Sequence, residues 1–244
     1  MARDRKYIGI THPEKLLDNA VDFLCFKNST TITSDTDGNG NPVQNGGSTV
    51  SISITFQVTS TAGTNPIAGF QCSLDNSPFT NCATTSPATI SYNSLATGQH
   101  TFAVRAVDTQ GNVDPTPATF SWAILTPTQG IQKLINTINS FNLPKGVTSS
   151  LEAPLNAALA QLNSNNNTPA CNQLNAFLNQ VNAKQNNGQL TPQQATDLSQ
   201  QAKAIQQAIG CSNIGGMPGQ TNQLLNNVGP GGGGGDDNND DDNP

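Results

Sequence analysis

Charged side chains are scarce in this sequence. Asp, Glu, Lys and Arg make up 11% of the 244 residues, against about a quarter in an average soluble domain. The few cations are scattered, and the segment from Val50 to Asn213 contains five acidic and five basic residues, so its net charge is zero. Without a basic patch there is nothing to hold a phosphate backbone, and nucleic acid is excluded as an expected partner.

The residues that usually carry out catalysis are also few. The whole chain has two Glu and two His, and the histidines are His12 and His100. His100 precedes a predicted strand, and no Ser or Cys nucleophile signature surrounds it, so we interpret it as structural. An enzyme needs a nucleophile, a base or a metal-ligand set. The sequence therefore predicts no enzymatic activity, no catalytic residue and no cofactor.

Long apolar runs are missing as well. No stretch is long enough to span a bilayer. Residues 1–27 include a possible amphipathic helix over 13–26, but they lack the apolar run and the cleavage site of a signal peptide. Three explanations are open: a fragment of a longer surface protein, a misplaced start, or a cytoplasmic protein. We favour the first two, because the rest of the chain has the character of an exported protein.

The five cysteines are better explained by disulfides than by metal. The chain has no C-x-x-C motif, and its only histidines are His12 and His100, which disfavours zinc. Free buried thiols are the other alternative. Cys72 and Cys82 flank the turn sequence DNSP, close enough for a local bridge, and Cys25 has no assigned partner. Disulfides indicate an oxidising compartment outside the cytoplasm.

Alternation of apolar and polar residues between Gly69 and Trp122 predicts antiparallel strands. In QHTFAVRAVD the apolar residues Phe102, Val104 and Ala106 alternate with less apolar neighbours, the period-two pattern of a strand with one buried face. The turn DTQGN follows, in which Asp108 can bond its own backbone and Gly111 supplies a positive φ. We expect a β-sandwich.

This part of the chain resembles the Ig-like repeats of secreted and surface-anchored prokaryotic proteins. The shared text is F-x-C-S-L-D, then C, then H-T-F-x-V-R-A-x-D, then G-N-V-D-P-T-P-A, matched between Phe70 and Ala118, and the resemblance covers residues 30–125. It implies a spacer or adhesive unit without catalytic residues.

Further strands and a core can be proposed for this sandwich. We expect a short first strand over Thr31–Thr33 and another over Ser51–Val58, with Ile52, Ile54, Phe56 and Val58 on one face. The rest of the expected core consists of Phe70, Leu74, Phe79, Ile90, Tyr92, Leu95, Phe102, Val104, Phe120 and Trp122.

One polar loop is a weak calcium candidate. Asp35, Asp37 and Asn39 lie at the alternate positions that open a calcium-binding loop, but the twelfth position, which should carry a bidentate carboxylate, is Gly46. A polar hairpin is therefore the preferred interpretation. Asp108 and Asp114 could likewise hold calcium between modules, although their spacing is chiefly a turn signal.

After the boundary at 124–128 the apolar period changes to that of helices. The first expected helix carries Ile131, Leu134, Ile135, Ile138 and Phe141 on one side. We expect Ser149 or Ser150 to cap a second helix with Pro154 in its first turn. A third starts near Thr168, and a fourth runs from Thr191 to Gly210. If the last two are antiparallel, Cys171 lies beside Cys211.

The helical half resembles the FIMAH-type domain that follows Ig-like and other modules in exported prokaryotic proteins. The matching text runs from Leu143 to Cys211, and both cysteines fall at the positions of that family. The resemblance implies the fold and no biochemical role. Because Glu152 is the only Glu of this half and it contains no His, a di-metal carboxylate site is excluded.

The C-terminal segment is rich in Gly and Asp. It has too little apolar surface for a core, so residues 213–244 are predicted to be disordered. A solvated tether is the preferred interpretation, ahead of a wall linker or a calcium-attracting tail. Two sequons, at Asn28 and Asn166, are candidate glycosylation sites in surface loops.

The sequence thus predicts a multidomain protein, all-β and then all-α. Its parts are an N-terminal segment (1–27), an Ig-like sandwich (28–125), a four-helix antiparallel domain (128–212) and the tail. We expect a non-enzymatic secreted or cell-surface protein that contacts a surface or wall component, protein or glycan. The alternative is a glycan- or wall-binding appendage of a secreted hydrolase. The ligand, anchoring mode and oligomeric state are not assigned.

Overall fold

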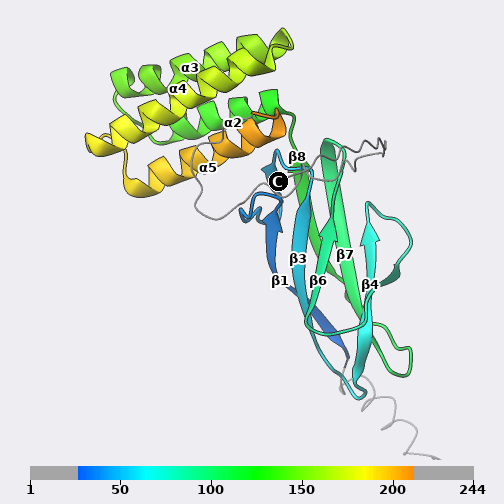
Figure 1. Ribbon diagram of the computed structural model, residues 1–244. Coiled ribbons are helices and arrows are strands. Elements are labelled where there is room, and N and C mark those ends of the chain that lie inside the picture. The colour runs from blue at the N-terminus through cyan, green and yellow to red at the C-terminus, as the bar shows by residue number, and fades with distance from the viewer. Residues whose placement is uncertain (1–26, 212–244) are drawn as a thin grey trace, which may run out of the picture. The chain divides into compact units, whose positions relative to one another are not determined.

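A computed structural model describes residues 27–211 (Figure 1). The expectations for the N-terminal segment, for Cys25 and for the C-terminal tail lie outside the described residues. The strands are β1 (Ser29–Asp37), β2 (Gly47–Thr49), β3 (Ile54–Thr61), β4 (Ile67–Leu74), β5 (Thr80–Ala83), β6 (Ala88–Tyr92), β7 (Gly98–Asp108) and β8 (Ala118–Ile124). The helices are α2 (Pro127–Ser140), α3 (Lys145–Asn163), α4 (Asn167–Asn186) and α5 (Pro192–Ala208).

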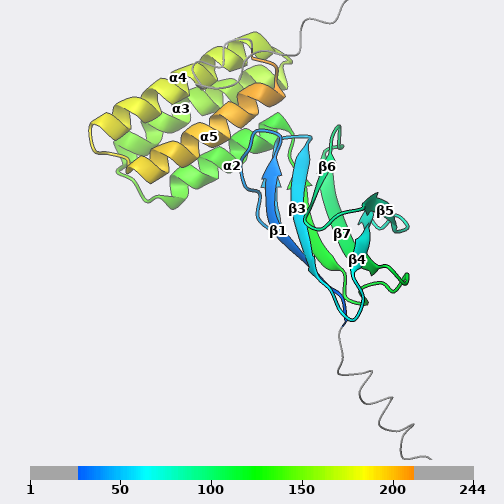
Figure 2. The same cartoon turned by 60° about the horizontal axis from the view of Figure 1, so that its bottom comes forward.

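The strands form two sheets that pack face to face (Figures 1 and 2). One sheet has the order β1-β3-β6 and the other β2-β8-β7-β4-β5. All pairs are antiparallel except β2 with β8. Consecutive strands such as β3 and β4 belong to opposite sheets, and β7 lies between β4 and β8. This is the strand arrangement of an Ig-like sandwich, so the predicted fold is confirmed.

Aromatic rings fill the space between the sheets. Phe56 of β3 stacks on Phe102 of β7 at a centroid distance of 4.3 Å, and Trp122 of β8 meets Phe56 edge-on at 5.7 Å. These three side chains are at most 1% exposed. Because each ring comes from a different strand, and β3 belongs to the opposite sheet from β7 and β8, burial of these rings holds the two layers together.

Three expectations about the sandwich are wrong in detail. The first strand is longer than predicted, since β1 spans Ser29–Asp37 with a bulge near Thr33. Ile52 is 51% exposed and precedes β3. Here the Ser51 hydroxyl oxygen accepts hydrogen bonds from the backbone N–H of Gly38 and of Ser53, which replaces the regular ladder. Phe79 is half-buried in the turn before β5 and is absent from the buried core.

The four helices of the described chain bury one shared apolar core. Thr126 and Thr191 each form a capping box, at the starts of α2 and α5, and a proline follows each at the first helical position. Fully buried members of the core include Ile131, Leu134, Ile138, Leu151, Leu155, Leu174, Phe177 and Leu198. The expected apolar side of the first helix is confirmed, since Ile131, Leu134, Ile135 and Ile138 are buried and Phe141 is partly buried.

The start of α3 differs from the prediction. The helix begins at Lys145, and Pro154 lies in its interior and not in the first turn. Proline lacks the N–H that would bond the carbonyl four residues earlier. The apolar stripe formed by Val147, Leu151, Leu155 and Ala158 is nevertheless continuous through this position. Tertiary burial of that stripe therefore outweighs the local cost of the proline.

Both predicted disulfides are present. Cys72–Cys82 joins β4 to β5 across 10 residues. Cys171–Cys211 spans 40 residues and joins the N-terminal part of α4 to the segment that follows the end of α5 at Ala208. The antiparallel packing of α4 and α5 brings the second pair together, as expected from the sequence. Between residues 27 and 211, no helix combines the length and apolar character needed to cross a membrane.

Candidate functional site

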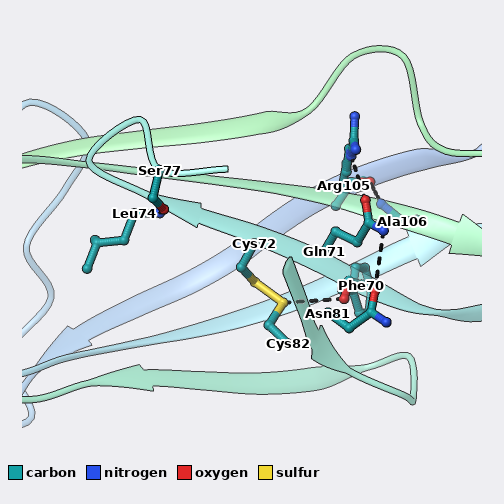
Figure 3. Close-up of a disulfide and its surroundings, with 10 residues drawn as sticks. Phe70, Gln71, Cys72, Leu74, Ser77, Asn81, Cys82, Arg105 and Ala106 are labelled. Atoms are coloured by element: carbon teal, nitrogen blue, oxygen red, sulfur yellow. Dashed lines mark hydrogen bonds between the residues drawn. A yellow bond between two sulfur atoms is a disulfide. The ribbon is translucent and has the colours of Figure 1, made fainter. Parts of the chain in front are cut away.

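The Cys72–Cys82 bridge anchors one edge of the five-stranded sheet (Figure 3). Cys72 is 4% exposed and faces the core, whereas Gln71 beside it is half-buried on the opposite face. The Cys82 sulfur lies 3.5 Å from the Phe70 carbonyl oxygen. Since a disulfide sulfur carries no hydrogen, this is a packing contact. The bridge holds the short edge strand β5 against β4.

A row of polar side chains crosses the outer face at this edge. The register places Gln71 of β4 beside Arg105 of β7 on one side and Asn81 of β5 on the other. The Arg105 Nε donates to the Gln71 Oε1 at 3.0 Å, and the Gln71 Nε2 donates to the Asn81 Oδ1 at 3.3 Å (Figure 3). The bonds run in one direction, so the amide nitrogen of Asn81 is left as a donor at the edge.

Arg105 also stacks on an aromatic ring. Its guanidinium carbon lies 4.2 Å from the centre of the Phe79 ring, a cation–π contact. Phe79 therefore contacts Arg105 and is absent from the buried core. Arg105 is the only Lys or Arg between residues 28 and 125. Composition alone pointed to the absence of a basic patch, and only the strand register reveals how this single cation is positioned.

His100 lies between two oxygen acceptors at the start of β7. Its Nδ1 is 2.9 Å from the Asp75 Oδ2, and its Nε2 is 2.8 Å from the Ala96 carbonyl oxygen. Burial lowers the pKa of His100, but the Ala96 carbonyl and the Asp75 carboxylate outweigh burial and raise the pKa above its ordinary value. With no nucleophile in contact, the pair fixes the Asp75 turn to β7, which agrees with the structural interpretation of His100.

The weak calcium candidates form a tight turn at the end of β1. The Asp37 Oδ1 accepts hydrogen bonds from the backbone N–H of Asn39 and of Asn41, at 2.9 and 3.0 Å. Its Oδ2 accepts from the Thr49 hydroxyl at 2.7 Å, and the Asp35 Oδ2 accepts from the Val43 N–H at 2.8 Å. These carboxylates therefore serve as acceptors for the loop itself, as in the preferred hairpin interpretation. Calcium binding here stays a prediction.

The same turn is built a second time at the end of β7. The Asp108 Oδ1 accepts from the N–H groups of Gln110 and Asn112, and Gly111 takes a φ of 84°. Side-chain hydrogen bonds from Asn112 and Asn65 lower the pKa of Asp108 to about 2. The spacing D-x-x-G-N in both loops was the signal that could have identified the Asp37 turn from sequence.

Asp114 is used in the interior of the sandwich. It is 1% exposed, and its Oδ2 accepts from the backbone N–H and the hydroxyl of Thr30, at 2.8 and 2.7 Å. Its Oδ1 accepts from the N–H and hydroxyl of Thr116. All these donors belong to the protein. Within residues 27–211, no group of three or more His, Cys, Asp or Glu side chains is placed to hold a metal ion.

The two glycosylation candidates lie in different environments. Asn28 is only 6% exposed, its Nδ2 donates to the Asn112 carbonyl at 3.3 Å, and its Oδ1 accepts from the Gly63 N–H. The expectation of a surface position is therefore wrong for Asn28. Asn166 is exposed at the N-cap of α4, and its modification stays a prediction.

A hollow of about 420 Å³ lies at the edge between β1 and β8. Hydroxyl and amide side chains line much of it, among them Thr31, Ser34, Asn45 and Thr119. It contains one carboxylate, Asp35, which already accepts a hydrogen bond from the Val43 N–H. The hollow offers no nucleophile and base in contact, so it provides polar binding groups and no catalytic pair.

Comparisons with known proteins address each half of the chain. Residues 128–207 match the FIMAH domain. Fibronectin(III)-like modules of Clostridium thermocellum CbhA align at 15% identity over 40% of this chain and 98% of theirs, with a TM-score of 0.31. An extracellular domain from B. thetaiotaomicron aligns at 13% identity over 41% of this chain and 16% of its own, with a TM-score of 0.33.

A longer but weaker alignment is to a beta-1,2-glucanase from Parabacteroides distasonis. It has 13% identity, covers 73% of this chain and 24% of that chain, and gives a TM-score of 0.22. The comparison with curated protein sequences finds no match. The sandwich is identified by its own strand order, β1-β3-β6 in one sheet and β2-β8-β7-β4-β5 in the other. Residues 128–207 of this chain form a FIMAH domain, and an Ig-like β-sandwich precedes it.

Proposed function

We propose that this chain is a non-enzymatic accessory part of an exported protein. The sandwich acts as a spacer or adhesion unit, and the FIMAH domain acts as a docking domain. The observation that carries the proposal is that each folded half is closed by its own disulfide, Cys72–Cys82 in one and Cys171–Cys211 in the other. Disulfides persist in oxidising compartments, which supports a location outside the cell or on its surface.

The use of the carboxylates supports a non-catalytic role. In the sandwich, Asp37, Asp108 and Asp114 accept hydrogen bonds from backbone and side-chain donors in turns or between strands. His100 is held between Asp75 and a backbone carbonyl. General acids and bases need a proton-transfer partner within reach of a substrate. These groups are committed to holding loops in place.

The compartment can be tested on protein recovered from its native host. Mass spectrometry of unreduced peptides should find the 72–82 and 171–211 peptides linked. Free thiols at all four positions would argue for a reducing compartment and against this proposal.

The role can be tested by binding. We expect the purified chain to be retained by intact cells of the host, with no turnover of polysaccharide or peptide substrates. Hydrolysis of a substrate that persists after contaminating enzymes have been ruled out would contradict the non-enzymatic role.

A second candidate is a glycan- or wall-binding appendage of a secreted hydrolase. The outward donors of Arg105 and Asn81 at the β5 edge favour it, because sugars present acceptor oxygens. A glycan array separates the candidates. Selective glycan binding supports the appendage, and retention by cells without glycan binding supports the spacer or adhesion role.

A further inference from the structure

The Arg105 guanidinium is half-buried and only partly used by the protein. Its Nε donates a hydrogen bond to the Gln71 side chain, and its guanidinium carbon lies over the Phe79 ring. Neither terminal nitrogen has a hydrogen-bond partner among residues 27–211. A guanidinium with both terminal nitrogens available matches the geometry of a carboxylate, which it can bind through two parallel hydrogen bonds.

The surroundings hold this group in position. Gln71 and Arg105 are direct cross-strand neighbours, and Asn81 is the neighbour of Gln71 on the other side (Figure 3). Phe79 and Asn81 both lie within the loop closed by the Cys72–Cys82 bridge. A strand, a ring and a disulfide therefore restrict the guanidinium before any ligand arrives, which reduces the entropy lost on binding.

We propose that this outer face, formed by Arg105, Gln71, Asn81 and Phe79, binds an acidic polysaccharide through the carboxylate of a uronic acid residue. Arg105 pairs with the carboxylate, and the Asn81 amide donates to a neighbouring sugar oxygen. The proposal deepens the appendage candidate above and rests on the chain being a binding module.

The charge of the sandwich favours a sparsely charged glycan over an acidic peptide. Residues 28–125 contain five Asp and one Arg, so their net charge is −4. A run of acidic side chains is repelled by this surface and finds a single cation. A polysaccharide that alternates acidic and neutral sugars presents one carboxylate at a time and many hydroxyl groups, which suits one guanidinium flanked by amides.

The test is a ¹⁵N NMR titration of the whole chain with a tetrasaccharide in which glucuronate alternates with a neutral sugar, and with its methyl ester as the neutral matched ligand. We expect the Arg105 Nε–H resonance to shift with the acid. The acid should bind at least about tenfold more tightly than the ester, since bonds between ionised partners are roughly twice as strong as neutral ones.

Variants locate the effect. Arg105→Gln should weaken binding of the acid about tenfold, and Arg105→Lys should fall between it and the wild type, because lysine keeps the charge but loses the fork. Lys145→Gln, which removes an exposed cation at the start of α3, is the matched control and should bind as the wild type does. An unchanged thermal midpoint checks that each variant is folded.

Equal affinity for acid and ester would overturn the proposal, as would unaltered binding by a folded Arg105→Gln variant. Tighter binding of hexa-aspartate than of the alternating acidic tetrasaccharide would overturn it in favour of an acidic protein partner. If the Arg105→Gln variant fails to fold, the proposal is still tested on the wild type, by the difference in affinity between acid and ester and by the shift of the Arg105 resonance. Failure here leaves the disulfide and cell-retention tests intact, so the broader role is judged separately.

Discussion

At the scale of single residues, His100 shows how a buried ionisable group can stabilise a turn. Both of its ring nitrogens face oxygens that can only accept, from Asp75 and Ala96, so the doubly protonated imidazolium satisfies both contacts. Loss of either proton leaves a nitrogen lone pair facing an oxygen. The charged ring therefore adds to the hydrogen bonds between Asp75 and Thr101 that hold this turn, and its pKa is raised because the two acceptors outweigh burial.

The first prediction concerns stability at neutral and alkaline pH. Because the folded-state pKa of His100 is raised, its contribution is fully present below the unfolded value of about 6.5 and is lost as pH rises through the folded-state pKa. The thermal midpoints of the wild type and of the His100→Gln variant should differ most near pH 5.5, and this difference should shrink at alkaline pH. His12 is present in both proteins and cancels. A difference that grows with pH contradicts this account.

The second prediction concerns stability at acidic pH. Hydrogen bonds from Asn112 and Asn65 lower the pKa of Asp108 to about 2, so its contribution is present above the unfolded pKa and is lost as pH falls toward about 2. The urea midpoints of the wild type and of Asp108→Asn should differ by a constant amount from pH 7 to pH 5 and approach each other below pH 4. A constant difference down to pH 2 would show that the carboxylate charge is irrelevant.

The third prediction concerns the buried carboxylate of Asp114. Asp114→Ala leaves the Thr30 and Thr116 donors without acceptors, and such unsatisfied groups cost about 3 kcal/mol in total. Urea unfolding measures the loss. Thr31→Ala, which alters the exposed neighbour of Thr30, is the control and should stay close to the wild type. A loss of stability no larger than that of the control rules this role out.

At the scale of secondary structure, α5 shows how a capping box at the N-terminus fixes the position at which a helix begins. Thr191 accepts a hydrogen bond from the Gln194 N–H, and the Gln194 side chain accepts one from the Thr191 N–H. The rest of the helix is stabilised by burial of one face, which includes Ala195 and Leu198. The start of α5 is therefore determined locally.

The fourth prediction follows from this cap. Thr191→Ala should destabilise the helical half by about 1 kcal/mol, since it removes a capping acceptor. Thr196→Ala, at an exposed position inside the same helix, should be neutral or slightly stabilising, because alanine is the better helix former. Circular dichroism at 222 nm during urea unfolding distinguishes the two variants. Equal effects would mean that the cap contributes nothing.

At the scale of the whole molecule, two disulfides support two separate cores. The rings of the sandwich form one apolar cluster, and most of the second cluster comes from α2 to α5. Closing a 40-residue loop lowers the entropy of the unfolded helical half more than the 10-residue loop lowers that of the sandwich. The longer bridge therefore matters more to stability.

The fifth prediction measures this difference. Replacing Cys171 and Cys211 by Ser should destabilise the helical half by about 4 kcal/mol, and replacing Cys72 and Cys82 should cost about 3 kcal/mol in the sandwich. The helical signal in urea unfolding should respond chiefly to the first pair. An equal response of that signal to both pairs is the result that would refute separate stabilisation.

Local sequence patterns were sufficient for β7, for the presence of the four helices and for both disulfides, but they did not predict β2 or β5. The alternation in β7 and the three-and-four spacing in α2 and α5 reflect burial of one face, which depends on the residue's own position in a strand or helix. Ile52 and Pro154 were misplaced because their conformations are decided by distant partners. Serine hydrogen bonds reshape the segment before β3, and a continuous buried stripe carries α3 through its proline.

The sequence by itself determined that the described chain holds a β module and then a helical module, each with its own pair of cysteines. Only the tertiary structure decided that Arg105 lies beside Gln71 and over Phe79, and that Asp114 bonds Thr30. The physical reason is the sequence separation over which each kind of interaction acts. Burial periodicity is expressed within a few neighbouring residues, whereas the pairing of β4 with β7 joins residues 34 apart, and the contact of Asp114 with Thr30 joins residues 84 apart.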